Sequence, residues 1–133
     1  MSFLLGVQHV NLTIDEGLEA LEIARHFYCD VLGLERLPRP ATTDSGRPGL
    51  WLALGQSGQQ IHIGAEAKAE SFNGPSRRHS AFLVQNLEGL QAHLLAAGAE
   101  VAETDQFPGQ RRLFCRDPFG NLLELVELNK EVD

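Results

Sequence analysis

The sequence is poor in cysteine and in basic residues, and both shortages narrow the range of functions. Its 133 residues include two cysteines, Cys29 and Cys115, which lie far apart and form no C-x-x-C motif. Sparse unpaired cysteines are typical of a reducing compartment, so we expect two free thiols in a cytoplasmic protein. Lysine and arginine number 11 against 18 acidic residues, and the formal charge is −7 at pH 7. Because no basic stripe is available, we expect neither nucleic acid nor an acidic membrane as a partner.

Long hydrophobic runs and nucleotide-binding loops are also missing. The first residues, MSFLLGVQ, contain no basic region and no long apolar stretch, so we expect neither a signal peptide nor a membrane span. The glycines between residues 55 and 58 lack the lysine of a P-loop and the spacing of a dinucleotide-binding loop. A chain of this length forms one ordinary domain, and it buries about two thirds of its unfolded surface without needing a disulfide or structural metal.

The first half of the sequence predicts one strand, one helix and then further strands. Alternating apolar residues predict a strand over 7–14, and Asp15 can cap the helix that follows. Gly33 stands where that helix would need a left-handed residue to end. The stretch 36–49 is rich in Pro and Gly and predicts a loop, with room for a short edge strand. Strands follow over 50–55 and 60–64.

The second half repeats this order after an Ala/Gly/Ser-rich segment, 64–76, that indicates a linker. A strand opens at His79, Asn86 can cap a helix that Gly98 ends, and strands are expected over 101–107, 112–117 and 122–128. We therefore predict an α+β fold in which two tandem βαβββ modules, 5–64 and 77–129, make up a single domain over 1–133.

Four polar side chains interrupt the predicted strands at positions that the repeat relates. His9 and His79 open the first strand of each module, 70 residues apart, whereas His62 and Glu124 lie in the last strand of each, 62 residues apart. If the modules pack about a pseudo-twofold axis, the four side chains can meet at one point. A buried carboxylate without a partner costs several kcal/mol, and a divalent cation is a suitable partner for Glu124.

Simpler interpretations remain for each of these residues. Glu124 can lie on a solvated face or pair with an arginine, and a strand histidine can be an ordinary hydrogen-bonded residue. Glu127 lies on the opposite face of its strand and is expected to be exposed. His26 and His93 fall on the two helices without a repeat partner, so we expect them at the surface.

The aromatic and arginine residues are assigned mainly to the core and to the solvated surface. We expect Trp51, on a sheet, to be able to line a cavity, and we expect the other four aromatics to be core: Phe27, Tyr28, Phe82 and Phe114. Four arginines form two pairs that indicate solvated clusters, although they could also hold an anionic substrate at a cavity rim: Arg77, Arg78, Arg111 and Arg112.

Several ordered motifs resemble the vicinal oxygen chelate superfamily, which includes glyoxalase I, extradiol dioxygenases, fosfomycin-resistance proteins and bleomycin-resistance proteins. They are HVNL, ARHFYCDVLGLE, RHSAFLV and FCRDPFGNLLEL, and they span essentially the whole chain. Within the last motif, DPFGN predicts a tight turn, because Pro presets φ, Gly adopts unusual backbone angles, and Asp and Asn bond their own backbone. That turn delivers Glu124 into the closing strand.

The resemblance implies curved mixed sheets around a metal-binding cavity, with His9, His62, His79 and Glu124 at the metal positions. Three imidazoles and a carboxylate suit Zn, Ni, Co or Fe. The implied activity is of glyoxalase type, a lyase or isomerase that acts on a small hydroxy-carbonyl compound or its thiol adduct. Glu124 would be the general base, and the protein would be a homodimer. The metal would polarise a carbonyl and stabilise an enediolate-type oxyanion.

Two other activities occur among the proteins that the chain resembles. In glyoxalase I the position of His62 is usually a glutamate, so this chain departs from that pattern. Extradiol dioxygenases and fosfomycin-resistance proteins use only the positions of His9, His79 and Glu124, which would make His62 a fourth ligand or a neighbour. The alternatives are therefore an Fe(II) ring-cleaving dioxygenase and a metal-free small-molecule binding protein of the bleomycin-resistance type.

Overall fold

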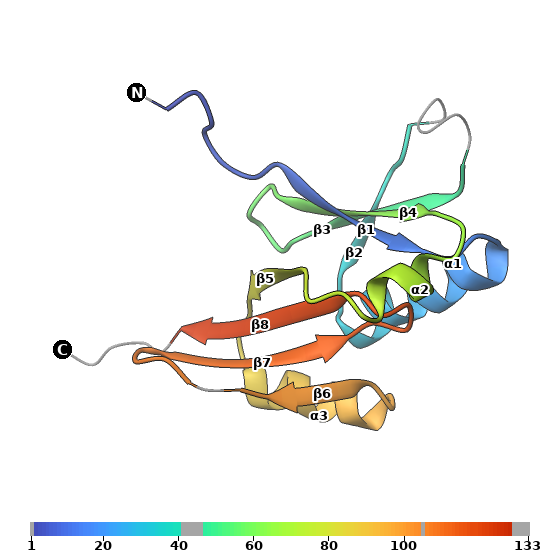
Figure 1. Ribbon diagram of the computed structural model, residues 1–133. Helices are drawn as coiled ribbons and strands as arrows, with labels where there is room; N and C mark the ends of the chain where they lie inside the picture. Colours follow the sequence, from blue (N-terminus) through green and yellow to red (C-terminus); the bar gives the residue numbers. More distant parts are fainter. Residues whose placement is uncertain (1, 41–46, 105, 129–133) are drawn as a thin grey trace. The chain divides into compact units, whose positions relative to one another are not determined.

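A computed structural model describes residues 2–40, 47–104 and 106–128. The chain divides into two compact units, Met1–Ala69 (the first unit) and Glu70–Asp133 (the second unit). Each unit contains its own four-stranded mixed sheet, and the predicted α+β fold with two βαβββ modules is confirmed (Figure 1). None of the described helices is long and apolar enough to cross a membrane.

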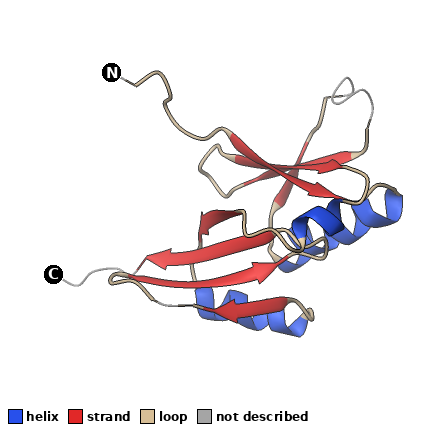
Figure 2. Ribbon diagram, in the orientation of Figure 1, coloured by secondary structure: helices blue, strands red, loops and turns tan. Residues whose placement is uncertain are grey.

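The first unit orders its strands β1-β4-β3-β2, so the first and last strands of the module are neighbours. β1 and β4 run parallel, and the other pairs are antiparallel. Helix α1 packs against β1 and β3 (Figure 2). The bounds of the elements are β1 His9–Ile14, α1 Leu18–Arg25, the π-helix η1 His26–Val31, β2 Glu35–Leu37, β3 Gly49–Ala53 and β4 Gln60–Ala65.

The helix of the first unit starts later than the sequence predicts. Asp15 is not its N-cap: the helix begins at Leu18, and Gly17 holds the cap position with φ of 108° and no side-chain cap bond. Leu18 is 76% exposed, and the buried residues of the helix are Ala20, Ala24, Phe27 and Tyr28. The last six residues form π turns, and Gly33, with φ of 78°, follows their end as predicted.

Alternation along the strands separates a core face from a second face in the first unit. Leu12, Ile14, Ile61 and Ile63 are almost fully buried, and Leu50 and Leu52 join them from β3. Residues between them in sequence point to the other face. Ile61 and Ile63 point into the core. His62 lies between them in the sequence, so its side chain points to the second face of the sheet.

The second unit repeats the arrangement with strand order β5-β8-β7-β6. β5 and β8 are parallel, the other pairs are antiparallel, and α3 packs against β6 and β8. The predicted linker 64–76 contains a short helix, which corrects the sequence assignment. The elements are α2 Ala69–Asn73, β5 His79–Leu83, α3 Leu87–Ala96, β6 Glu100–Glu103, β7 Gln110–Arg116 and β8 Leu122–Leu128.

Helix α3 begins and ends at the predicted residues. The side chain of Asn86 accepts a hydrogen bond from the Gly89 backbone N–H at 3.1 Å, as an N-cap should. Gly98, with φ of 78°, follows the helix. Leu87 and Leu94 are buried on the inner side of the helix.

The predicted turn between β7 and β8 is confirmed in detail. Asp117 Oδ1 accepts hydrogen bonds from the backbone N–H groups of Phe119 and Asn121, both at 2.8 Å. Asn121 Nδ2 donates to Asp117 Oδ2 at 2.8 Å, and Gly120 has φ of 82°. Asp117 is only 5% exposed, so the turn is fixed by buried polar bonds, and it positions the start of β8 two residues before Glu124.

Candidate metal centre

The strand registers place the four predicted ligands at equivalent positions in the two units. His9 pairs with Gln60 across β1 and β4, and His62 stands two residues farther along β4. In the second unit His79 pairs with Leu122 across β5 and β8, and Glu124 stands two residues farther along β8. Each unit therefore brings one side chain of its first strand next to one of its last, on the same face of the sheet.

In the first unit the two imidazoles are stacked. The ring centroids of His9 and His62 are 3.9 Å apart with an interplanar angle of 17°. Trp51 covers His62, with centroids 4.3 Å apart and an angle of 3°. His62 Nε2 is 2.8 Å from Gln60 Oε1, and His9 Nδ1 contacts Gln8 Oε1. Trp51 thus lies beside a candidate ligand, as its position on a sheet allowed.

In the second unit the predicted carboxylate faces both a histidine and an arginine. Glu124 Oε1 is 3.0 Å from His79 Nε2, and Glu124 Oε2 accepts a hydrogen bond from Arg112 Nη1 at 3.1 Å. The Glu124 side chain is 12% exposed, which excludes the solvated-face interpretation. The other simple interpretation, an ion pair with an arginine, agrees with the structure, because Arg112 pairs with Glu124.

The His79 ring is oriented by the main chain of a neighbouring arginine. Its Nδ1 lies 3.1 Å from the carbonyl oxygen of Arg77. A carbonyl oxygen only accepts, so Nδ1 carries the proton in this bond. Nε2 of a neutral His79 is then an acceptor that faces another acceptor, Glu124 Oε1, at 3.0 Å. Two acceptors at this distance need either a proton between them, on the imidazole or on the carboxyl group, or a metal cation.

The donor atoms of the second unit fit a metal ion. Two ligand atoms bonded to one cation at about 2.1 Å are roughly 3.0 Å apart in octahedral coordination and about 3.4 Å apart in tetrahedral coordination. The separation of His79 Nε2 and Glu124 Oε1 is 3.0 Å. The hydrogen bond that His79 Nδ1–H donates to the Arg77 carbonyl oxygen also matches the outer contact that usually orients a metal-bound imidazole.

The four predicted ligands occur as two pairs, one in each unit. Among residues 2–40, 47–104 and 106–128, no group of three or more His, Cys, Asp or Glu side chains is placed to hold a metal ion. The meeting of both pairs at one cation stays a prediction.

Arg112 was assigned to a solvated cluster by its sequence, and this assignment is wrong. Its side chain is only 13% exposed, because the guanidinium lies against Glu124 and over the ring of Phe107, 4.0 Å from the centroid. The alternation of side chains along β7 would have predicted this position of Arg112. Arg112 and Phe114 lie on the same face of the sheet as Glu124, whereas Arg111 pairs with Glu127.

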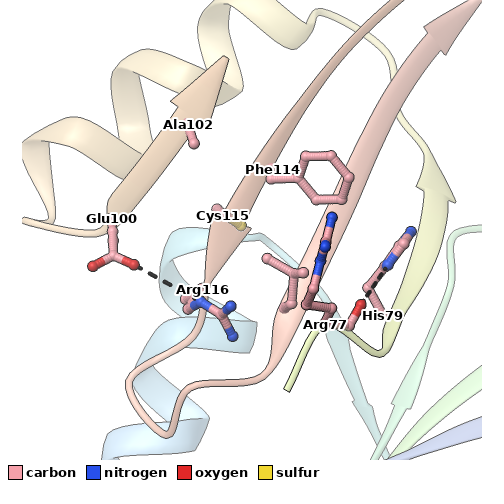
Figure 3. A pocket seen from close by; sticks show the side chains of 8 residues that line it. Arg77, His79, Glu100, Ala102, Phe114, Cys115 and Arg116 are labelled. Carbon is pink, nitrogen blue, oxygen red and sulfur yellow. Dashed lines mark hydrogen bonds and ion pairs between the residues drawn. The ribbon is translucent and has the colours of Figure 1, made fainter. Parts of the chain in front are cut away.

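A cavity of about 340 Å³ opens on the same face of the second sheet (Figure 3). Phe114, predicted to be core, is a half-buried wall residue whose ring meets the His79 ring edge-on with centroids 5.1 Å apart. Phe27 and Tyr28 are core, as expected. The lining consists of Arg77, His79, Glu100, Ala102, Phe114, Cys115, Arg116 and Leu122.

The remaining candidates have no part in this centre. Both cysteines are free, and burial raises the pKa of the Cys115 thiol to about 12, so it stays protonated near neutral pH. His26 is exposed and bonds Asp30 Oδ2 at 3.1 Å, and His93 is exposed on α3. Glu127 Oε2 accepts the Asn86 backbone N–H at 2.8 Å, away from Glu124.

The sequence and the fold were compared with known proteins. Residues 7–125 match the family described as the Glyoxalase/Bleomycin resistance protein/Dioxygenase superfamily. A crystal structure from Bacillus anthracis assigned to the glyoxalase family is 32% identical, with a TM-score of 0.80 over 97% of this chain and 99% of that one. A search of curated proteins found no significant match.

More distant structures share the fold. An antibiotic-binding protein from Streptomyces sp. CB03234 is 19% identical, with a TM-score of 0.70 over 97% of this chain and 100% of that one. The genomically encoded fosfomycin resistance protein of Listeria monocytogenes is 18% identical, with a TM-score of 0.72 over 96% of this chain and 97% of that one. A further crystal structure of the Listeria protein contains Mn(II) and sulfate.

Proposed function

The chain belongs to the glyoxalase/bleomycin resistance protein/dioxygenase superfamily, and from this premise we propose that it is a divalent-metal-dependent enzyme of glyoxalase type. Its substrate would be a small hydroxy-carbonyl compound or the adduct of such a compound with a thiol. The superfamily also contains binding proteins, so the proposal depends on the chemistry of particular residues rather than on the fold.

The observation that carries the proposal is the contact between His79 Nε2 and Glu124 Oε1. The Arg77 carbonyl oxygen accepts a hydrogen bond from His79 Nδ1–H, so a neutral imidazole presents the lone pair of Nε2 to a largely buried carboxylate 3.0 Å away. A divalent cation bound by both atoms removes that repulsion. The stacked His9 and His62 rings occupy the equivalent positions in the first unit and supply imidazole donors of the same class.

The proposed ligands are His9, His62, His79 and Glu124. Imidazole and carboxylate donors favour Zn, Ni, Co or Fe(II), and the Mn(II) complex of the Listeria relative adds Mn(II) to the metals to be tested. When bound, the metal supplies a Lewis acid that polarises a substrate carbonyl.

The chain's own residues would divide the remaining work. Arg112 holds Glu124 Oε2 at 3.1 Å, so proton transfer would fall to Oε1 once this oxygen has left the metal. Glu124 would take the proton from the carbon next to the polarised carbonyl, as a general base. The Arg77 carbonyl keeps His79 in one tautomer and one orientation throughout.

The Arg112 contact also favours a second candidate, a metal-free binding protein. In that case a protonated His79 and Arg112 would balance the charge of Glu124 without any metal. This alternative predicts that the purified protein contains no metal and that a chelator leaves its stability unchanged.

The test combines metal analysis with turnover. Protein purified without added metal should contain a divalent metal, and it should convert a hemithioacetal. Glu124→Gln should lower turnover by about a thousandfold, because a general base contributes about 10²–10⁴. Glu127→Gln is the matched control in the same strand, and it should keep the metal and the activity. Stoichiometric metal without turnover of any substrate class tested would overturn the enzyme proposal.

We further propose that the protein is a cytoplasmic homodimer. Both thiols are free, which supports a reducing compartment. Light scattering after size-exclusion chromatography would measure the mass in solution, and a mass equal to one 14.6 kDa chain would contradict the dimer.

A further inference from the structure

We infer that the cavity of the second unit holds a small organic acid, with its carboxylate bound by Arg77 and an apolar body against Phe114 and Leu122. This inference names the class of substrate for the proposed function. It rests on the proposed function for the part of the substrate that reacts. The volume of about 340 Å³ lies near the lower end of the range for small-molecule sites, about 300–1,000 Å³.

The walls of the cavity are apolar where the sheet forms them. Phe114, Leu122 and Ala102 lie on one face of β7, β8 and β6, because Phe114 pairs in register with Ala102 and Arg116 pairs with Leu122. An aromatic ring and two aliphatic side chains favour a flat or short-chain apolar group, which gains free energy when it leaves water.

The polar lining is dominated by two arginines, and one of them is already engaged. Arg116 donates from Nη1 to the carbonyl oxygens of Gly120 at 2.8 Å and Asn73 at 3.3 Å, and from Nη2 to that of Ser76 at 3.3 Å. Its Nε lies 3.9 Å from Glu100 Oε2. Its hydrogen-bonding groups therefore hold the α2–β5 connection and the β7–β8 turn, and its charge faces Glu100.

Arg77 is the cation that remains for a ligand. Within the part of the chain that the structure describes, its guanidinium makes no hydrogen bond and no ion pair, although its carbonyl oxygen accepts from His79 Nδ1. Figure 3 shows its side chain extending along the sheet toward the Phe114 ring. A guanidinium that lines a cavity without a carboxylate partner recognises a carboxylate or a related oxyanion through paired N–H donors.

His79 connects this cavity to the candidate metal centre. It lines the cavity and also contacts Glu124 through Nε2 at 3.0 Å. A ligand whose carboxylate lies on Arg77 would therefore have its other end beside the reactive pair. The resulting substrate class is a small carbonyl compound that also bears an acidic group.

The test measures binding to the full-length protein with the metal removed by chelator, so that it depends on neither metal nor turnover. Phenylacetate is the acidic probe, phenylacetamide is its neutral isostere, and NMR titration of ¹⁵N-labelled protein gives both Kd values. Phenylacetate should bind about tenfold more tightly than the amide. Arg77→Gln should remove that tenfold difference and leave amide binding unchanged.

Arg78→Gln is the matched control. Arg78 is the next residue, its Nε donates to Ser76 Oγ at 3.1 Å, and it does not line the cavity. It should change the Kd of phenylacetate by less than about twofold. The inference would be overturned by equal losses in both variants, by equal binding of acid and amide, or by no binding of phenylacetate. Any of these results would contradict the inference about the cavity and would leave the metal and turnover tests of the proposed function unaffected. A protein that contains no metal and has no activity, but binds phenylacetate as expected, would contradict only the proposed function.

Discussion

In both units, the last strand presents its candidate ligand opposite an aromatic residue: Trp51 pairs with His62 in the first unit, and Phe114 pairs with Glu124 in the second. Two residues earlier on the neighbouring strand the units differ. The first has Gly49 and the second has Arg112. The repeat thus preserves the register, whereas the second unit has an arginine where the first has a glycine, against which the Arg39 guanidinium lies, 3.2 Å from the position of a Cβ.

This difference explains why the two ligands are of different types. A Cβ at Gly49 would lie 2.5 Å from the carbonyl oxygen of Ile63, so no side chain fits there without moving the sheet. His62 needs no counter-ion and stacks on Trp51 instead. Glu124 is a half-enclosed carboxylate and has Arg112 at 3.1 Å. The strand next to the candidate ligand therefore has a glycine in the first unit and an arginine in the second.

The turns before β4 and β8, the strands that carry His62 and Glu124, allow the strongest test of this comparison. In the second unit, the side chain of Asp117 is buried and accepts hydrogen bonds from the N–H groups of Phe119 and Asn121 and from Asn121 Nδ2. Asp117→Ala leaves buried donors without partners and should lower the free energy of unfolding by about 3 kcal/mol. Urea denaturation measures this change.

The matched change in the first unit is Ser57→Ala. Ser57 Oγ donates to the Leu54 carbonyl at 2.7 Å and accepts from the Gln59 N–H at 3.1 Å, but this turn is exposed. Water can replace both bonds, so the loss should be about 0.5 kcal/mol. Equal losses in the two variants would show that burial does not distinguish the two turns.

The second test removes the arginine that stands in the second unit at the position of Gly49. Arg112→Gln leaves Glu124 with His79 alone, so the metal-free protein should lose about 2 kcal/mol of unfolding free energy. If Arg112 also orients Glu124 for a metal, titration of the chelated protein should show metal affinity reduced about tenfold.

Arg111 provides the control for this change. It is the preceding residue, it is exposed, and it pairs in register with Glu127 on the opposite face. Arg111→Gln should change stability by less than about 0.5 kcal/mol. An Arg112→Gln protein as stable as the Arg111→Gln protein would mean that the ion pair with Glu124 contributes nothing.

The sequence was sufficient for the repeat and for the strand positions of the four candidate ligands, because both depend on period-two alternation and on local turn chemistry. The DPFGN turn, the Asn86 cap and the Gly33 stop are all determined within a few residues. The errors arose where distant residues decide the outcome. Arg112 was assigned to solvent because its exposure depends on Phe107 and Glu124, and Phe114 was assigned to the core because the cavity beside it is a tertiary feature.

The third test makes the first unit resemble the second. His62→Glu introduces a carboxylate beside Trp51, in the unit that has Gly49 at the position of Arg112. Relative to His62→Gln, which has similar size and no charge, the metal-free protein should lose about 1–2 kcal/mol of unfolding free energy at neutral pH. Denaturant unfolding with chelator present gives the comparison. Equal stability of the two variants would show that Arg112 is not what makes a carboxylate tolerated at the position of Glu124 in the second unit.

The smallest effect concerns the two helix starts. Gly17 begins α1 without a side-chain cap, whereas Asn86 begins α3 with φ of 56° and accepts the Gly89 N–H at 3.1 Å. Asn86→Ala loses the cap and places alanine in a left-handed conformation, which should cost about 1 kcal/mol or slightly more. Asn86→Gly also loses the cap but tolerates the positive φ, as Gly17 does, so its loss should be only a few tenths of a kcal/mol. If thermal unfolding shows the glycine variant to be as destabilised as the alanine variant, the side-chain bond rather than the backbone conformation limits the start of α3.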